Sequence, residues 1–317
     1  MTTKAVALSL LLALLLAACQ TTPATSQLQP VKLVLAWTHE SEFAGFYVAD
    51  SQGYFGDAGL AVEIVEGGID VDEYALLTEG QVDFAVMTLN EYKAAVAEDD
   101  SIIAVAATFQ IPPPVFFAKA NSGISTPQDF AGKRVAIKHE GWRGIFTEML
   151  TNAGVDVAAV TQVDVPDDIT LFYNNEVDVW SGYVHDEVTE ARLGGHDIQI
   201  IFPYEYGVGS YEGLVVTTKE TIGQRPEQVK GLLEASVKGW QYAIEHPDET
   251  AAITEKWQPQ YNQEFHRTAF AELIPLVDTG TAPILSIDPD RWLDSMAGVA
   301  TSDDPKVDLT FISQIQP

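Results

Sequence analysis

The residues best placed to bind a small molecule are aromatic side chains at the ends of predicted strands. Stacking a flat ring on an aromatic side chain contributes roughly 1–3 kcal/mol, by analogy with nucleobase stacking. A single aromatic residue is more often part of a hydrophobic core. Trp37 and Trp180 stand at motif positions, however, which favours a binding role for both. The full predicted binding set is Trp37, Glu42, Tyr47, Asn90, Phe109, Trp142, Arg143, Trp180, Tyr183 and Tyr206.

Carboxylates lie near several of these aromatic residues in the sequence. A carboxylate accepts hydrogen bonds from a ring N–H or an exocyclic amine, and so it can fix the orientation of a heterocycle. The chain has 46 acidic residues, so any one of them is more often a solvated surface charge. The carboxylates with a possible binding role are Glu40, Glu42, Glu140, Asp186, Glu205 and Glu212.

Two other sequence patterns suggest a site for a metal ion or for an anion. His39-Glu40 and His139-Glu140 both follow predicted strands, but the chain has no HxxH or HExxH spacing, so we predict no metal and no cofactor. Residues 141–144 (GWRG) precede a predicted helix, and a helix N-terminus favours anions. A phosphate or sulfonate site at Arg143 and a simple loop are the two alternatives there.

The N-terminal residues predict export. Lys4 precedes an apolar run over residues 5–16, interrupted only by Ser9, and the run ends in Leu16-Ala17-Ala18-Cys19. The run is shorter than the roughly 20 apolar residues of a membrane span and is typical of a secretory signal. Its end resembles a bacterial lipoprotein signal, in which the cysteine is lipidated. We predict a signal peptide at 1–18, lipidation of Cys19 and a Thr, Gln and Pro rich tether at 19–30.

An ordinary signal peptide with an incidental Cys19 is the alternative. Cys19 is the only cysteine in the chain, so the mature protein has no disulfide. We therefore expect an extracytoplasmic protein, anchored in a membrane and found in the periplasm or on the outer face of the cell membrane.

Composition limits the partners and the size of the fold. The chain has 317 residues and a net charge of −29, which repels nucleic acid and excludes that class of partner. A hydrophobic content of 46% is typical of a folded globule of one large domain or two ordinary ones.

Strands and helices alternate along most of the chain, which predicts parallel or mixed sheets covered by helices. Two α/β halves in succession suggest two lobes with a ligand site between them. The predicted strands are 31–37, 61–65, 82–86, 102–109, 115–119, 132–137, 161–165, 177–180, 197–202 and 214–217. The predicted helices are 43–53, 72–79, 91–98, 144–153, 168–174, 186–193, 226–245, 247–257, 262–273 and 289–297.

An ordered set of motifs resembles periplasmic solute-binding proteins of the NMT1/THI5-like group, which includes the SsuA/THI5 proteins. The opening match is Trp37 followed by AGFYVA at 44–49, GYF at 53–55 and GLAVEI at 59–64. Later matches are GQVDFAV at 80–86, PQDFAGKRV at 127–135, NEVDVWSGY at 175–183 and PEQVK at 226–230. Each motif is weak alone, but their order and spacing extend over nearly the whole mature chain.

The resemblance implies a two-lobed periplasmic-binding-protein fold of type II, with α/β lobes joined by a double crossing. Lobe 1 would contain residues 31–118 and 213–317, and lobe 2 residues 119–212. It also implies a monomer that closes on its ligand and delivers it to an ABC permease and its ATPase.

The resemblance narrows the ligand to a flat aromatic nitrogen heterocycle, either riboflavin or a thiamine pyrimidine. The thiamine branch has an Asn- and His-rich segment after the first Trp, and THESEF at 38–43 departs from it. The abundant aromatic residues suit a flavin ring. A sulfonate or nitrate is an alternative that would require more cations.

An enzyme related to the fungal pyrimidine synthases is a further alternative. Those relatives carry a CCCFC segment, whereas this chain has no cysteine after Cys19. We therefore expect a binding protein and not an enzyme. A sensor domain is a third class, but no further membrane or signalling segment follows the predicted fold.

Overall fold

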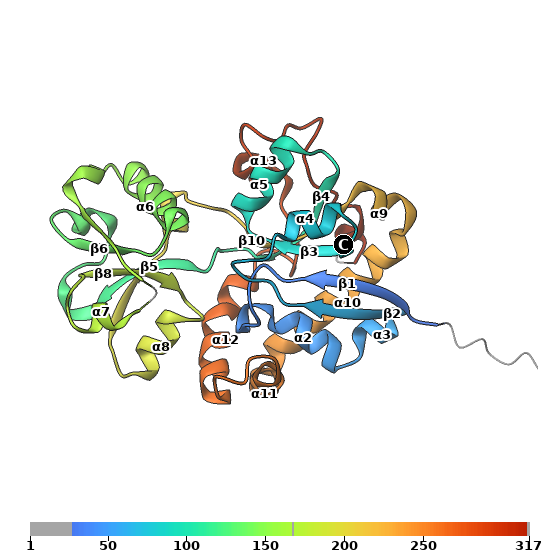
Figure 1. The fold of residues 1–317 in the computed structure, drawn as a ribbon, viewed down its shortest axis with the longest axis horizontal. Coiled ribbons are helices and arrows are strands. Elements are labelled where there is room, and N and C mark those ends of the chain that lie inside the picture. Colours follow the sequence, from blue (N-terminus) through green and yellow to red (C-terminus); the bar gives the residue numbers. More distant parts are fainter. Residues whose placement is uncertain (1–26, 167, 316–317) are drawn as a thin grey trace, which may run out of the picture.

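The computed structural model describes residues 27–166 and 168–315, which form two lobes side by side (Figure 1). The predicted signal peptide, Cys19 and most of the predicted tether lie outside the described residues. Each lobe contains one five-stranded mixed sheet. This arrangement confirms the predicted two-lobed α/β fold.

The sheet of lobe 1 has the strand order β2-β1-β3-β10-β4. β1 pairs in parallel with β2 and β3, whereas β10 runs antiparallel to β3 and β4. All four residues of β3 are buried, because helices cover both faces of this sheet. The strands are β1 (Gln29–Val34), β2 (Leu60–Val65), β3 (Phe84–Met87), β4 (Ile102–Phe109) and β10 (Glu212–Thr218).

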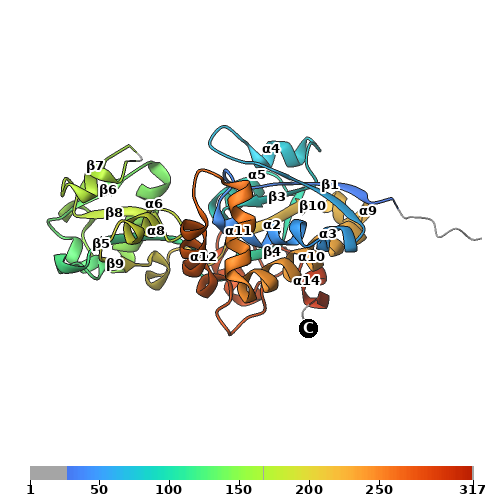
Figure 2. The same ribbon diagram turned by 90° about the horizontal axis from the view of Figure 1, so that it is seen from below.

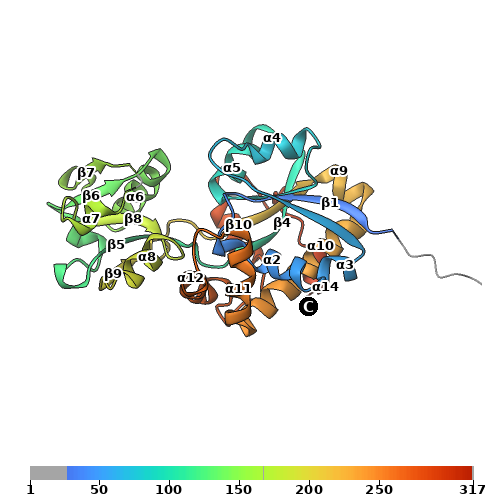
Figure 3. The same ribbon diagram turned by 60° about the horizontal axis from the view of Figure 1, so that its bottom comes forward.

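Helices α4 and α5 lie on one face of this sheet, and α2, α3 and α10 lie on the other (Figure 3). α5 begins with a capping box, in which the Thr88 hydroxyl accepts from the Glu91 N–H and the Glu91 carboxylate accepts from the Thr88 N–H. The helices of this lobe are α2 (Ala44–Ser51), α3 (Tyr54–Asp57), α4 (Glu73–Thr78), α5 (Leu89–Glu98), α9 (Lys219–Gln224), α10 (Pro226–Glu245), α11 (Pro247–Trp257), α12 (Gln263–Val277), α13 (Pro289–Ser295) and α14 (Thr310–Ile315).

The sheet of lobe 2 has the order β7-β6-β8-β5-β9. Its strands are β5 (Pro114–Lys119), β6 (Arg134–Ile137), β7 (Thr161–Asp164), β8 (Val179–Tyr183) and β9 (Ile198–Ile201). Its helices are α6 (Glu140–Asn152), α7 (Thr170–Tyr173) and α8 (Glu187–Leu193). Short 3-10 helices complete the fold: η1 (Ser41–Phe43), η2 (Ala120–Ser122), η3 (Pro127–Phe130), η4 (Val157–Ala159) and η5 (Pro203–Tyr206).

Three predicted boundaries differ from the structure. β5 pairs with β8 and β9, so residues 114–118 belong to the sheet of lobe 2, although the sequence had placed them in lobe 1. β1 begins at Gln29, inside the predicted tether. α6 begins at Glu140, so residues 141–144 form its first turns and do not precede it. In each case local composition predicted a boundary that is set by pairing or by helix packing.

The two lobes meet near α12, which packs against η1 of its own lobe and against α8 of lobe 2 (Figure 2). Arg192 of α8 forms an ion pair with Glu272 of α12 across this contact. The chain passes between the lobes after β4 and again before β10 (Figure 1). Among the described residues, no helix combines the length and the apolar character needed to cross a bilayer.

Candidate functional site

Polar side chains from both lobes converge where the segment before α2 faces the turn after β8. We call this group the interlobe cluster and define it as Glu40, Glu42, Lys138, Tyr183, His185, Asp186, Glu187 and Glu212. His185 Nε2 lies 3.3 Å from Glu40 Oε2 and 3.8 Å from Glu42 Oε2. These contacts join lobe 2 to lobe 1.

The lobe 1 side of the cluster is fixed by buried hydrogen bonds. Ser41, between Glu40 and Glu42, has its Oγ 3.0 Å from His266 Nδ1 on α12. His266 Nε2 lies 3.1 Å from the Gln258 carbonyl, and this partner assigns the proton to Nε2 and leaves Nδ1 to accept from Ser41. Glu212 begins β10 and accepts a hydrogen bond from the backbone N–H of Leu89. α12 and β10 therefore hold the three carboxylates in place.

The lobe 2 side is built around Glu187 at the start of α8. Its carboxylate accepts a 2.8 Å hydrogen bond from the Tyr183 N–H and forms an ion pair with Lys138, which follows β6. A Cβ at Gly182 would lie only 2.6 Å from Glu187 Oε2, so a larger residue here would displace the Glu187 carboxylate. These contacts of Glu187 fix the turn that carries His185 and Asp186 between β8 and α8.

Burial perturbs several titratable groups of the cluster. Desolvation raises the pKa of Glu42 to about 7, although the charge of His185 opposes the shift. Desolvation likewise raises the pKa of Asp186 to about 8, with Glu187 and Glu40 adding to it. For His185, burial lowers the pKa, but the hydrogen bond to Glu40 and the charge of Glu42 outweigh burial and raise it to about 9.

Tyr183 and Glu212 share this environment. Desolvation raises the pKa of the Tyr183 phenol well above its usual value, and Glu212 and Glu42 raise it further. Desolvation also raises the pKa of Glu212 well above the ordinary range, with the charge of Glu42 adding to it. The cluster is therefore rich in carboxyl groups, and burial favours the neutral form of Glu42, Asp186 and Glu212.

Several polar atoms close to the cluster have no hydrogen-bond partner among the described residues. They are Trp180 Nε1 and Ser181 Oγ on β8, His185 Nδ1 in the following turn and Thr108 Oγ1 near the end of β4. Buried polar groups in folded proteins are normally hydrogen-bonded to protein or water, so these atoms leave hydrogen-bonding capacity unused in this arrangement of the lobes.

The predicted binding set separates into three groups. Glu42 and Tyr183 belong to the interlobe cluster, and Trp37, after β1, is 43% exposed. Arg143 pairs with Glu140 and Asp164 on α6 and β7, while Asn90 is exposed on α5 and Tyr206 is half-buried on η5. The other four side chains lie in hydrophobic cores: Tyr47, Phe109, Trp142 and Trp180.

Two of these core residues illustrate how neighbouring rings enclose them. Trp142 packs edge-on against Phe116 with ring centroids 5.8 Å apart, and Phe109 packs similarly against Trp240 at 6.2 Å. The structure thus gives packing roles to these rings and leaves no open face on them for stacking a ligand. Of the carboxylates considered from the sequence, Glu140 and Glu205 are exposed, whereas Glu40, Glu42, Asp186 and Glu212 join the cluster.

The sequence did not single out His185, Lys138 or Glu187. Only their position in the sequence could have indicated a role in binding. Lys138 follows a predicted strand, and the other two follow the NEVDVWSGY motif. It also did not single out Trp257, whose ring stacks on Tyr47 with centroids 4.8 Å apart and lies as close to the His39 ring.

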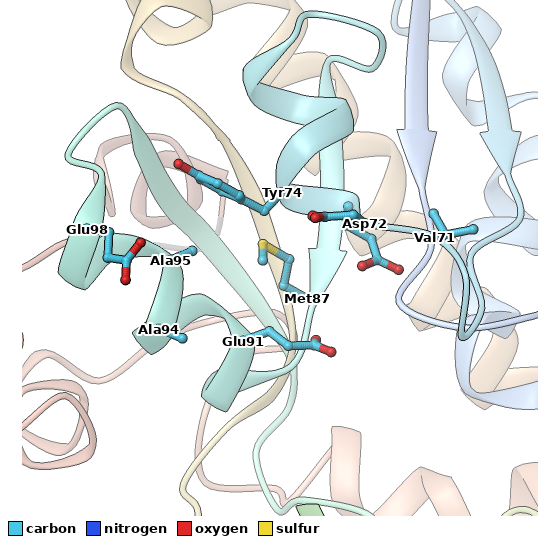
Figure 4. A pocket seen from close by; sticks show the side chains of 9 residues that line it. Val71, Asp72, Tyr74, Met87, Glu91, Ala94, Ala95 and Glu98 are labelled. Carbon is cyan, nitrogen blue, oxygen red and sulfur yellow. The ribbon is translucent and has the colours of Figure 1, made fainter.

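Two cavities lie elsewhere, on lobe 1. One, of about 470 Å³, is lined by side chains of α4, β3 and α5, among them Tyr74, Met87 and Glu91 (Figure 4). The other, of about 680 Å³, lies beside α13 and the C-terminal segment. Neither includes a residue of the interlobe cluster, where the perturbed groups and unpartnered polar atoms concentrate. We therefore regard the cluster, and not these cavities, as the functional site.

Comparisons with known proteins agree with this fold. A formylaminopyrimidine-binding protein of Halalkalibacterium halodurans is 28% identical over 301 residues, covering 90% of each chain. A 4-amino-5-hydroxymethyl-2-methylpyrimidine phosphate synthase of Legionella pneumophila is 25% identical, over 77% of this chain and 79% of the relative. The riboflavin-binding protein RibY of Chloroflexus aurantiacus is 24% identical, over 81% of this chain and 79% of the relative.

A solved structure supports the same architecture. The periplasmic aliphatic sulphonate binding protein SsuA of Escherichia coli superimposes with a TM-score of 0.66 at 14% identity, over 82% of this chain and 81% of that protein. The family model described as NMT1/THI5 like matches residues 40–250, a span that includes every residue of the interlobe cluster. The chain therefore belongs to the NMT1/THI5-like family.

Proposed function

We propose that this protein is the extracytoplasmic receptor of an ABC importer and binds an amino-substituted pyrimidine between its lobes. In this proposal the protein is held at the membrane by lipidated Cys19 and passes its ligand to a permease without chemical change. The observation that carries the proposal is the convergence of buried carboxylates from both lobes in the interlobe cluster.

Carboxylates suit this ligand because an aminopyrimidine presents N–H donors at its edge. Glu212 from lobe 1 and Asp186 from lobe 2 can each accept such a donor, and a ligand that contacts both stabilises the closed form. Trp37, the exposed aromatic residue of the predicted set, offers a stacking surface. A sulfonate or nitrate lacks the N–H donors that these carboxyl groups would accept.

Two observations favour the pyrimidine over riboflavin. Four of the rings expected to stack on a flavin lie in the cores, and a relative that matches 90% of this chain is named for a formylaminopyrimidine. The segment THESEF at 38–43 departs from the thiamine branch in sequence, but it supplies Glu40 and Glu42 to the cluster. The riboflavin-binding relative makes a flavin the natural competitor in a binding test.

Calorimetry on a soluble protein of residues 20–317, unfolded and refolded to remove any copurified ligand, tests the proposal. The probes are 4-amino-2-methylpyrimidine, an N-formylated aminomethyl derivative of it, 2-methylpyrimidine, riboflavin and ethanesulfonate. We expect binding of the two amino compounds only, and about 2.7 kcal/mol of stabilisation at a concentration of one hundred times Kd.

Matched variants locate the site. Asp186→Ala and Glu212→Ala should each weaken aminopyrimidine binding by about 10- to 100-fold, because a hydrogen-bond acceptor is lost. Glu205→Ala, which alters an exposed carboxylate, should leave Kd unchanged. Equal binding of 2-methylpyrimidine, or tighter binding of riboflavin, would refute the proposed ligand.

A further inference from the structure

Three side chains of the interlobe cluster have the spacing of metal ligands. The ligating atoms of Glu40, Glu42 and His185 all lie within 4.8 Å of one another. A tetrahedral ion with bonds of about 2.0–2.2 Å keeps its ligand atoms roughly 3.4 Å apart. The distances of 3.3 and 3.8 Å from His185 Nε2 to the two carboxylates match that separation.

His185 distinguishes this group from an acidic surface patch. Its side chain is 2% exposed, and its Nε2 points at the two carboxylates. Its other ring nitrogen is buried and has no hydrogen-bond partner within residues 27–166 and 168–315. Within this part of the chain, the ring is oriented by its contacts with the two carboxylates and by the Tyr183 ring, whose centroid lies 5.4 Å away.

The charge of the group matches a divalent ion. Once a bound ion has displaced the protons from these groups, two carboxylates and a neutral imidazole carry a total charge of −2, which one divalent cation neutralises. Lys138, the nearby lysine of the cluster, forms an ion pair with Glu187. One nitrogen and two oxygen ligands suit Zn²⁺ and similar transition metals better than Mg²⁺ or Ca²⁺, which prefer oxygen ligands alone.

We propose that Glu40, Glu42 and His185 bind one divalent transition-metal ion between the lobes. The ion would join the segment before α2 in lobe 1 to the turn after β8 in lobe 2, and so favour the closed form. This proposal departs from our expectation from the sequence, which was that no metal binds, and it uses Glu40 without its neighbour His39. The proposal does not require the aminopyrimidine.

The test uses the protein of residues 20–317 after dialysis against EDTA. Calorimetry with ZnCl₂ should give one site per chain, and CoCl₂ should give the visible spectrum of a tetrahedral ion. MgCl₂ and CaCl₂ at equal concentration control for unspecific attraction to a chain of net charge −29. Small-angle scattering should show a smaller radius of gyration with Zn²⁺ than with Mg²⁺.

His185→Gln and the double variant E40Q/E42Q should each lose about 100-fold or more in Zn²⁺ affinity and lose the cobalt spectrum. The control variant H139Q/E140Q alters an exposed His–Glu pair and should bind as the parent does. Circular dichroism shows whether each variant is folded, and E40Q/E42Q tests the site even if loss of the buried His185 ring prevents folding.

Zn²⁺ binding no tighter than Ca²⁺ binding, or full binding by folded E40Q/E42Q, would overturn the metal site. Aminopyrimidine binding is measured separately on the EDTA-treated protein. If the protein binds the pyrimidine but no metal, this inference alone is refuted. If it binds the metal but no pyrimidine, the proposed function alone is refuted.

Discussion

Glu73 shows at the scale of one residue what burial does to an acid in this chain. It lies in the first turn of α4 and is only 8% exposed. Desolvation raises its pKa to about 7, and the charges of Glu91 and Asp72 raise it further, while its own backbone N–H opposes the shift. Because the pKa is higher in the folded than in the unfolded protein, the neutral form favours folding, and that contribution is lost as pH rises from about 4.5 to 7.

Glu73→Gln should therefore stabilise the protein at pH 8 and change little at pH 4.5. A shift of this size corresponds to about 3 kcal/mol, which we reduce to about 1–2 kcal/mol because Glu73 lines an open cavity. Urea unfolding at the two pH values measures the difference. Glu98→Gln, an exposed position on the same cavity, is the control, and equal effects of both variants would contradict the argument.

Single residues also show what the sequence could reveal of the site. Glu42 and Tyr183 were predictable because a charged or aromatic residue follows a strand end. His185 was not, since its partners Glu40 and Glu42 lie in the other lobe and only the folded chain brings them together. Conversely, Trp180 and Phe109 looked like ligand contacts because the sequence does not show which face of a strand meets a helix.

Among the elements, the contact between α2 and α10 is the tightest constraint on lobe 1. A Cβ at Gly45 would lie 2.2 Å from the Trp240 ring, and a Cβ at Gly239 would lie 2.1 Å from the Gly45 carbonyl oxygen. Both positions need glycine for close approach, since each clash involves the facing helix. The contact fixes the start of α2, and with it the preceding segment that carries Glu40 and Glu42.

Gly239→Ala should destabilise the protein by about 2 kcal/mol or more, because the backbone of α2 cannot move without repacking the core. Gly223→Ala on α9 is the matched control, since its new methyl group meets nothing within 4 Å. The control should be neutral or stabilising by up to about 1 kcal/mol. Thermal or urea unfolding compares the two, and an equal effect on stability would show that the contact is looser than the structure indicates.

The alternation of strands and helices was predictable from the sequence, as was the existence of most elements. The sequence could not show which sheet β5 joins. Residues 114–118 have the pattern of a strand in either sheet, and the pairing of β5 with β8 and β9 joins residues far apart in the sequence. The start of α6 was missed for a local reason: glycines at 141 and 144 suggest a loop, yet the helix begins at Glu140.

At the scale of the whole molecule, Arg291 of α13 connects the two passages between the lobes. Its guanidinium donates to the carbonyl of Gln110, just after β4, and to the carbonyl of Ser210, just before β10. It also lies over the Tyr211 ring, 4.1 Å from the centroid. One nitrogen of this guanidinium therefore joins both crossing segments, while the planar group lies over the Tyr211 ring.

Arg291→Lys should widen the distribution of distances between the lobes, because a single ammonium group cannot make the same set of contacts. Small-angle scattering should give a larger radius of gyration, and ligand affinity should fall by about 3- to 30-fold as the closed form becomes less populated. Arg267→Lys alters an exposed arginine and serves as the control. Unchanged scattering in the Arg291 variant would show that the crossings are ordered without it.

If lipidated Cys19 holds the chain by its N-terminus, as we propose, the position of β1 has a mechanical consequence. Gln29–Val34 pairs in register with all six residues of β2 and lies between β2 and β3 in the sheet. Tension applied ahead of Gln29 pulls along the strand axis, so the hydrogen bonds to β2 are loaded in shear and share the force. Such a ladder resists a pull far better than one opened from an end. Lobe 1 would then carry the force from the anchor, and lobe 2 could move without bearing that force.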